Sequence, residues 1–109
     1  MLHFKKIFLL LILISFSFLG QEKTTISGTV YDDSNNETLI GVSIYFPELN
    51  TGTTTNEYGF YSITIPSGTH KIQVSYLGFT SINETLLLTE KTTKNFKLIE
   101  ESESLAEIV

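Results

Sequence analysis

The segment 53–68 constrains the fold of this chain more than any other stretch of its sequence. Asn56 and Gly59 mark a tight turn, because both residue types tolerate the backbone angles that turns require. Tyr61, Ile63 and Ile65 then alternate with polar or outward-facing positions, which is the period of a half-buried β-strand. Proline and glycine at 66 and 68 end the strand. A turn, a strand and a second turn leave no room for a helix here.

The same alternation recurs from residue 24 to residue 98, between turn signals spaced eight to twelve residues apart. The expected strands are 24–32, 41–46, 53–55, 58–65, 69–76, 79–88 and 92–98, with Gly78 as a turn that interrupts the pattern. This predicts an all-β fold, a seven-stranded antiparallel β-sandwich. Its expected core consists of Ile26, Val30, Val42, Ile44, Tyr61, Ile63, Ile72, Val74 and Tyr76.

The first twenty residues have the composition of a secretory signal peptide. Lys5 and Lys6 precede an uncharged apolar run over 7–19, which is short for a membrane span. Cleavage is expected after Gly20 or Gln21, and the alternative is an uncleaved N-terminal anchor. No cysteine follows the run to be acylated, so a lipoprotein is not expected. The chain is therefore predicted to be exported, with 1–20 as the signal peptide and 24–99 as one domain.

Composition excludes several classes of function. All seven basic residues are lysines, two of them in the leader, against twelve Asp and Glu, so neither nucleic acid nor anionic lipid is an expected partner. The chain has no cysteine, and His70 is the only histidine after the leader. Zinc, Cys/His and related catalytic sites need more such residues than the chain has. We therefore expect no enzyme activity, no catalytic residue and no cofactor.

One loop has a weak resemblance to a calcium site. Asp33, Asn35 and Glu37 have the spacing of the first oxygen ligands of a calcium-binding loop. Position six is Thr38 rather than glycine, and position twelve is Ile44 rather than glutamate. A polar turn without metal is the favoured interpretation.

Three aromatic residues alternate away from the expected core. Tyr31, Tyr45 and Phe60 could line a sugar-binding face, although such residues more often form cross-strand pairs on a sheet. The structural role is favoured. His70 falls on the apolar register of its strand near one end, and is expected to be a strand-edge residue.

Four segments together carry a family resemblance. They are Ile26-Ser-Gly-Thr-Val-Tyr-Asp32, Leu39-Ile-Gly-Val-Ser-Ile44, Thr55-Asn-Glu-Tyr-Gly-Phe-Tyr-Ser-Ile63 and Ile72-Gln-Val-Ser-Tyr-Leu-Gly-Phe79. Their spacing over 24–99 resembles the carboxypeptidase-regulatory-like domain, a transthyretin-like (prealbumin-like) seven-stranded sandwich. The chain departs from the family pattern at Asn56, where aspartate is common, and at Thr38-Leu39, where Pro-Leu is common. Both departures fall in turns.

The resemblance implies a setting. In Bacteroidetes this domain commonly stands behind the signal peptide of a TonB-dependent outer-membrane receptor for nutrient uptake. The implied partners are the plug and barrel of the same receptor, and the implied location is the periplasmic face of the outer membrane. The domain itself would bind no nutrient. A stand-alone secreted carbohydrate-binding or adhesion module is the alternative.

The end of the chain is similar to the junction before a receptor plug. Residues 100–103 are acidic and are expected to form a solvated linker within 100–109. The partner-binding segment expected after it consists of Leu105, Ala106, Glu107, Ile108 and Val109. By the resemblance it is either a segment gripped by the TonB energy-coupling protein or the first strand of the plug.

Overall fold

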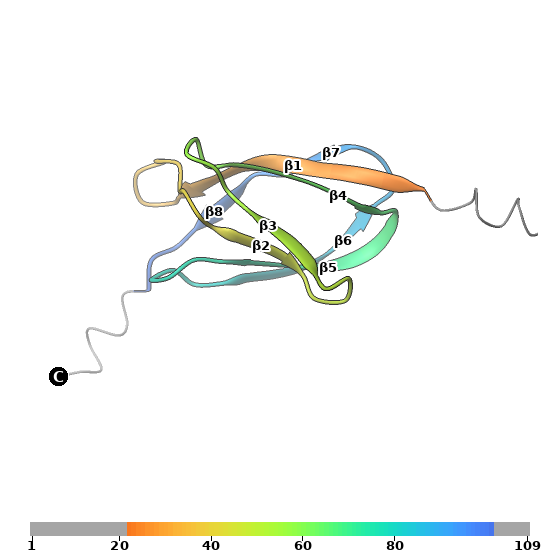
Figure 1. Ribbon diagram of the computed structural model, residues 1–109. Coiled ribbons are helices and arrows are strands. Elements are labelled where there is room, and N and C mark those ends of the chain that lie inside the picture. Colours follow the sequence, from red (N-terminus) through yellow and green to blue (C-terminus); the bar gives the residue numbers. More distant parts are fainter. Residues whose placement is uncertain (1–21, 102–109) are drawn as a thin grey trace, which may run out of the picture.

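The computed structural model describes residues 22–101, and within this range it contains strands and no helix (Figure 1). The strands are β1 (Lys23–Asp32), β2 (Ser43–Phe46), β3 (Thr51–Thr54), β4 (Phe60–Pro66), β5 (Gly68–Ser75), β6 (Ile82–Leu88), β7 (Thr92–Thr93) and β8 (Phe96–Leu98). The described part accordingly has no helix that is long and apolar enough to cross a membrane. The predicted signal peptide, 1–20, lies outside the described residues.

The strands form two four-stranded sheets that pack face to face. In the first sheet, β1 pairs with β4 on one side and with β7 and β8 on the other. The second sheet has the order β3-β2-β5-β6, and all of its pairings are antiparallel. The prediction of an all-β sandwich is therefore confirmed.

The last two strands differ from the prediction. The sequence indicated one antiparallel strand over 92–98, whereas β7 and β8 are two short strands, and both run parallel to β1. The reason lies in the route of the chain. β6 ends beside Gly68, at the end of the sandwich where β1 begins, so a chain that crosses there to the first sheet must follow the direction of β1.

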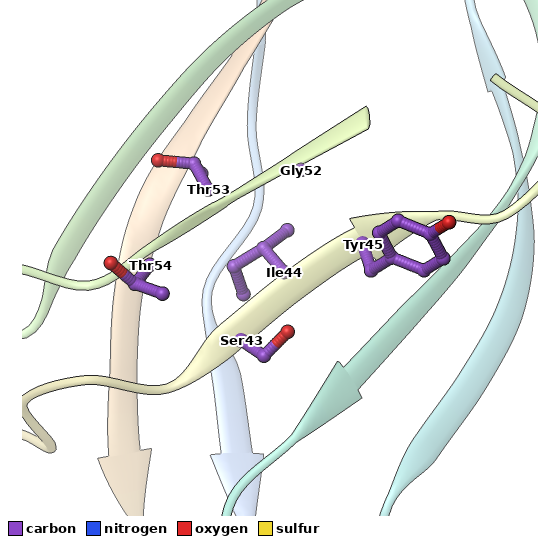
Figure 2. Close-up of a pocket in the computed structure, with 6 residues that line it drawn as sticks. All are labelled: Ser43, Ile44, Tyr45, Gly52, Thr53 and Thr54. Atoms are coloured by element: carbon purple, nitrogen blue, oxygen red, sulfur yellow. The ribbon is translucent and has the colours of Figure 1, made fainter. Parts of the chain in front are cut away.

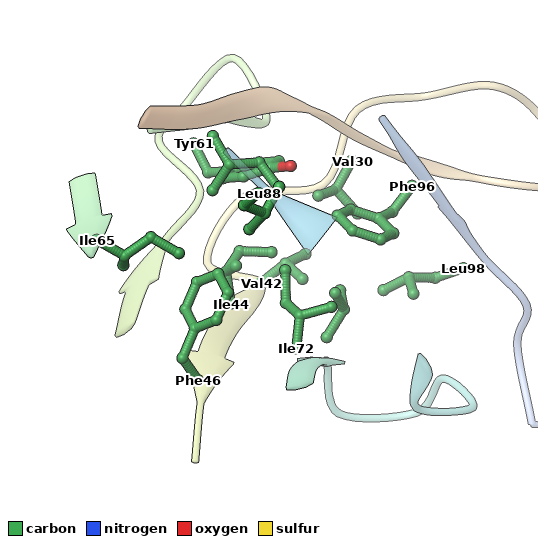
Figure 3. Close-up of a cluster of buried hydrophobic side chains, with 12 residues drawn as sticks. Val30, Val42, Ile44, Phe46, Tyr61, Ile65, Ile72, Leu88, Phe96 and Leu98 are labelled. Atoms are coloured by element: carbon green, nitrogen blue, oxygen red, sulfur yellow. The ribbon is translucent and has the colours of Figure 1, made fainter. Parts of the chain in front are cut away.

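The core lies between the sheets (Figure 3) and contains twelve buried side chains. They are Ile26, Val30, Val42, Ile44, Phe46, Tyr61, Ile65, Ile72, Val74, Leu88, Phe96 and Leu98. Seven of the nine predicted core residues are in this group. At roughly 25 cal/mol per Å² of apolar surface removed from water, such burial is the main stabilising term of a domain without disulfides.

Two predicted core residues are only partly buried. Ile63 packs against the core from β4 but is only partly buried, whereas Tyr61 and Ile65 on the same face of β4 are fully buried. Tyr76 follows the end of β5 and packs in a loop against Phe79, with ring centroids 5.6 Å apart. Both residues pack against the predicted core but are not fully buried, because alternation gives the face of a residue and not the depth of its burial.

The described chain enters the sandwich at one end and leaves it at the other (Figure 1). Glu22 accepts a hydrogen bond from Ser67 N, in the β4–β5 turn, which places the start of β1 at that end. The opposite end, here called the C-terminal end, is formed by the segments 33–42, 55–59 and 76–81 together with residues 99–101. This geometry fixes where any continuation of the chain must emerge.

Candidate functional site

The turn between β3 and β4 is built around the side chain of Asn56. Its Oδ1 accepts hydrogen bonds from Tyr58 N (2.9 Å) and Phe60 N (3.1 Å). Asn56 does not adopt the positive φ that its turn propensity suggested, and its side-chain oxygen has the structural role instead. Gly59 has φ of +76°, and a Cβ there would lie 2.6 Å from Thr38 Cβ. Position 59 therefore requires glycine on two counts.

Thr55, just before this turn, is a buried polar residue that sequence reasoning missed. Only 4% of its surface is exposed. Its hydroxyl donates to Leu39 O (2.6 Å) and accepts from Val42 N (2.9 Å), which satisfies two backbone groups of the β1–β2 loop. In the sequence, Thr55 looks like an ordinary β-prone residue, so no local signal revealed this role.

The chain leaves the domain along the loop that contains Gly78. Phe79 and Glu100 form an antiparallel bridge, Thr80 N donates to Ile99 O (2.8 Å), and Glu101 N donates to Gly78 O (3.0 Å). Gly78 itself has φ of +88°. Residues 100 and 101, assigned from the sequence to a solvated linker, therefore still pair with the domain. Leu105, Ala106, Glu107, Ile108 and Val109 lie outside the described residues.

The loop with calcium-like spacing is closed by its own hydrogen bonds. Asp32 Oδ1 accepts from Ser34 N (2.9 Å) and Ser34 Oγ (2.7 Å), and Asn35 Oδ1 accepts from Glu37 N (3.0 Å). No group of three or more His, Cys, Asp or Glu side chains in residues 22–101 is arranged to hold a metal ion. Of the three residues with calcium-like spacing, Asn35 therefore has its side-chain oxygen bonded to the backbone of the same loop.

The three outward aromatic residues lie on two different sheets. Tyr31 is on β1 and Phe60 is on the neighbouring strand β4. Phe60 pairs with Thr29, which is two residues before Tyr31 on β1. Tyr45 lies on β2, in the other sheet, and pairs with Gly52 of β3. A single sugar-binding face made of all three residues does not exist.

Tyr45 instead borders a shallow depression on β2 and β3, which is open to solvent and whose six lining residues appear in Figure 2. The phenol hydroxyl donates to Asn50 Oδ1 (2.8 Å), and the ring covers Gly52, whose Cβ would lie 3.1 Å from Tyr45 Cδ2. An aromatic side chain laid over a cross-strand glycine is a packing arrangement of antiparallel sheets.

Two titratable side chains, the buried Tyr61 and the partly exposed His70, have structural partners. The Tyr61 hydroxyl donates to Lys94 O, and burial raises the pKa of this phenol above its ordinary value. His70 Nε2 lies 2.7 Å from Pro66 O, and its ring meets that of Phe46 edge-on at 6.3 Å. His70 is therefore held at the start of β5, as expected for a strand-edge residue.

The sharpest close approach is at Gly28, where the segment between β7 and β8 crosses β1. A Cβ on Gly28 would lie 2.0 Å from Lys94 O. Lys94 N donates to Ser27 O (2.7 Å), and Asn95 Oδ1 accepts from Thr29 N (2.9 Å). Gly28 belongs to the first family segment, but the sequence alone gave no physical reason for glycine at this position.

A model of the CarboxypepD_reg-like domain family matches residues 26–109. This chain belongs to the CarboxypepD_reg-like domain family. The resemblance stated from the sequence is thereby confirmed. A TonB-dependent receptor of Formosa agariphila is 32% identical to this chain over 103 residues, which cover 94% of the chain and 10% of the receptor. The chain therefore spans about a tenth of the length of that relative.

Solved structures share the fold of this CarboxypepD_reg-like domain. A type II cohesin–X-dockerin complex of Acetivibrio cellulolyticus matches with a TM-score of 0.60 at 14% identity, over 70% of this chain and 56% of the other. A candidate carbohydrate-binding protein of Bacteroides uniformis matches with a TM-score of 0.54 at 15% identity, over 71% and 41%. At such identities the likeness concerns the sandwich fold alone.

Proposed function

We propose that this domain is the N-terminal periplasmic accessory domain of a TonB-dependent outer-membrane receptor for nutrient uptake. The observation that carries the proposal is the 32% identity to a receptor of this kind, which extends over 94% of the chain but only 10% of the receptor. The basic and apolar leader at 1–20 would export the protein and then be removed. The plug and barrel of the same receptor would follow in the polypeptide.

In this setting the sandwich is a non-catalytic spacer or docking module. The described chain enters the sandwich at one end and leaves it at the other. The domain would therefore act as a spacer between the N-terminus of the exported protein and the plug. The family to which it belongs is named for regulatory-like domains of carboxypeptidases, which agrees with a role beside a functional domain. Nutrient binding would belong to the rest of the receptor.

Residues 105–109 would be the functional continuation of the domain. They are apolar and β-prone, and acidic residues at 100–103 would keep them accessible to solvent. TonB could add such a segment as a strand to its own sheet. Equally, the segment could be the first strand of the plug. In both cases it emerges beyond Glu101, which is hydrogen-bonded to Gly78 at the C-terminal end of the sandwich.

A deletion in the full receptor tests the proposal. Removal of residues 24–99, with the leader and 100–109 retained, should leave nutrient affinity at the cell surface unchanged and should at most reduce uptake. The matched control is deletion of 105–109 with the sandwich intact, which should abolish uptake if TonB grips this segment. Loss of nutrient binding in the first variant, with the barrel correctly inserted, would show that the sandwich contacts the nutrient.

The reading frame after codon 109 gives an independent check. It should continue into a plug and a barrel. A stop codon directly after Val109, together with affinity of the secreted product for glycans, would establish the stand-alone module instead.

A further inference from the structure

Large exposed hydrophobic side chains gather at the C-terminal end of the sandwich. Within residues 22–101 there are six of them, and five lie at or beside this end: Ile40, Tyr58, Phe60, Leu77 and Ile99, here called the exit face. Leu77 is 97% exposed, Tyr58 70% and Ile99 62%. The sixth, Leu87, is 70% exposed and lies on β6 toward the opposite end. Apolar residues concentrated in this way mark interaction surfaces more often than scattered ones do.

The segments that carry the exit face are held together by backbone hydrogen bonds. Gly41 N donates to Thr55 O (3.0 Å), which joins the β1–β2 loop to the β3–β4 turn. Asp33 N donates to Leu98 O (2.9 Å), and Thr80 N donates to Ile99 O (2.8 Å). A shallow hollow lined by Gly41, Ser75, Tyr76 and Leu77 lies between two of these segments. The exit face is thus a preformed surface, which lowers the entropic cost of docking.

The rim of the exit face is acidic. The same four segments contain the exposed carboxylates of Asp33, Glu37, Glu57, Glu100 and Glu101. None of the five lysines in residues 22–101 lies on them. A partner that covers the face must therefore offer an apolar centre and lysine or arginine at its rim, because like charges brought together would oppose docking.

The polypeptide itself brings one partner to this face. Glu101 N donates to Gly78 O, so the polypeptide leaves the sandwich within the exit face. A domain that follows in the same polypeptide is therefore linked to this end of the sandwich, and linkage raises its effective concentration at the exit face, so weak complementary surfaces dock.

We propose that the exit face is the docking surface for the domain that follows this sandwich in the same receptor polypeptide, and that this domain presents an apolar centre with a basic rim. This inference rests on the proposed function, since a receptor plug would be the domain concerned. It adds a defined orientation, with the C-terminal end of the sandwich against the plug and the opposite end away from it.

Site-specific photo-cross-linking in the full-length receptor tests the orientation. Benzoylphenylalanine replaces Leu77 in one variant and Leu87 in the matched control, and the cross-linked peptides of the purified, irradiated receptor are identified by mass spectrometry. Leu77 and Leu87 are both highly exposed, so neither replacement disturbs the core. The Leu77 variant should give cross-links to peptides after residue 109 of the same chain, and the Leu87 variant should give few or none.

Charge reversal supplies a second test. Glu57→Lys combined with Glu100→Lys in the Leu77 variant should lower the yield of these cross-links about tenfold. Cross-links to another protein or to a second copy, an absence of cross-links, or equal yields from positions 77 and 87 would overturn the inference. The mass of the purified protein shows which hypothesis has failed. If the chain ends near residue 109, the proposed function is refuted together with the docking face. If the protein is a full-size receptor but lacks the expected cross-links, only the docking face is refuted.

Discussion

Replacement of Gly28 by alanine should be one of the most destabilising single-methyl changes in this domain. The added Cβ would lie 2.0 Å from Lys94 O and 2.6 Å from Lys94 C, both backbone atoms of the segment between β7 and β8. The segment would have to move by about 1 Å or more to reach ordinary van der Waals contact. Because backbone cannot rotate away as a flexible side chain can, the strain falls on the pairing with β1.

The size of the effect follows from the contacts that this movement weakens. They are the hydrogen bonds from Lys94 N to Ser27 O, from Thr29 N to Asn95 Oδ1, and from the Tyr61 hydroxyl to Lys94 O. At about 1 kcal/mol for each of these three hydrogen bonds, with about 1–3 kcal/mol for overpacking, we expect a loss of about 4–6 kcal/mol. A domain of this size has a free energy of unfolding of about 4–12 kcal/mol, so much of its stability would be lost.

Urea unfolding of the chain without its leader, followed by far-ultraviolet circular dichroism and tyrosine fluorescence, measures this loss. In thermal unfolding of the same protein, the melting temperature should fall by about 10 °C or more. Ser27→Ala is the matched control, because its side chain points away from the core on the same strand and should change stability by less than about 0.5 kcal/mol. If Gly28→Ala is as stable as this control, the close approach of Lys94 to β1 is wrong.

Three further predictions concern the core, the pH response and the loop at 33–37. Ile65→Ala should cost about 2–5 kcal/mol and Ile63→Ala clearly less, since only Ile65 is fully buried; equal unfolding midpoints would contradict this. Folding keeps the Tyr61 phenol neutral by raising its pKa, so stability should fall as the pH rises above about 10, the unfolded-state value. In Tyr61→Phe this fall in stability at alkaline pH should be absent when thermal unfolding is measured as a function of pH. If the stability of the variant and of the original protein falls equally with pH, the prediction is refuted. Millimolar Ca²⁺ should leave the melting temperature unchanged, whereas micromolar binding in calorimetry that Asp33→Ala abolishes would establish a metal site.

At the C-terminal end of the sandwich, some residue roles can be predicted from the local sequence and others cannot. Gly59 could be assigned to a turn from the local pattern, and the structure adds that Thr38 leaves no room for a Cβ at this position. Thr55, in contrast, is buried because the β1–β2 loop, which is distant in sequence, packs against its hydroxyl. The exit face likewise depends on which loops share an end of the sandwich. The burial of Thr55 and the composition of the exit face depend on contacts between segments far apart in the sequence. The residues next to each position therefore do not predict them.

The sequence by itself determined that this protein is an all-β sandwich, which strands it contains in the main, and most of its core, because side-chain alternation and turn residues act over a few neighbouring positions. Only the tertiary structure decided that β7 and β8 run parallel to β1, that the backbone of Lys94 leaves no room for a side chain at Gly28, and that Ile63 is only partly buried. Alternation specifies the face that a side chain takes. It does not specify which strand lies beside it, in which direction that strand runs, or how near the sheet ends, since those depend on the packing of the whole chain.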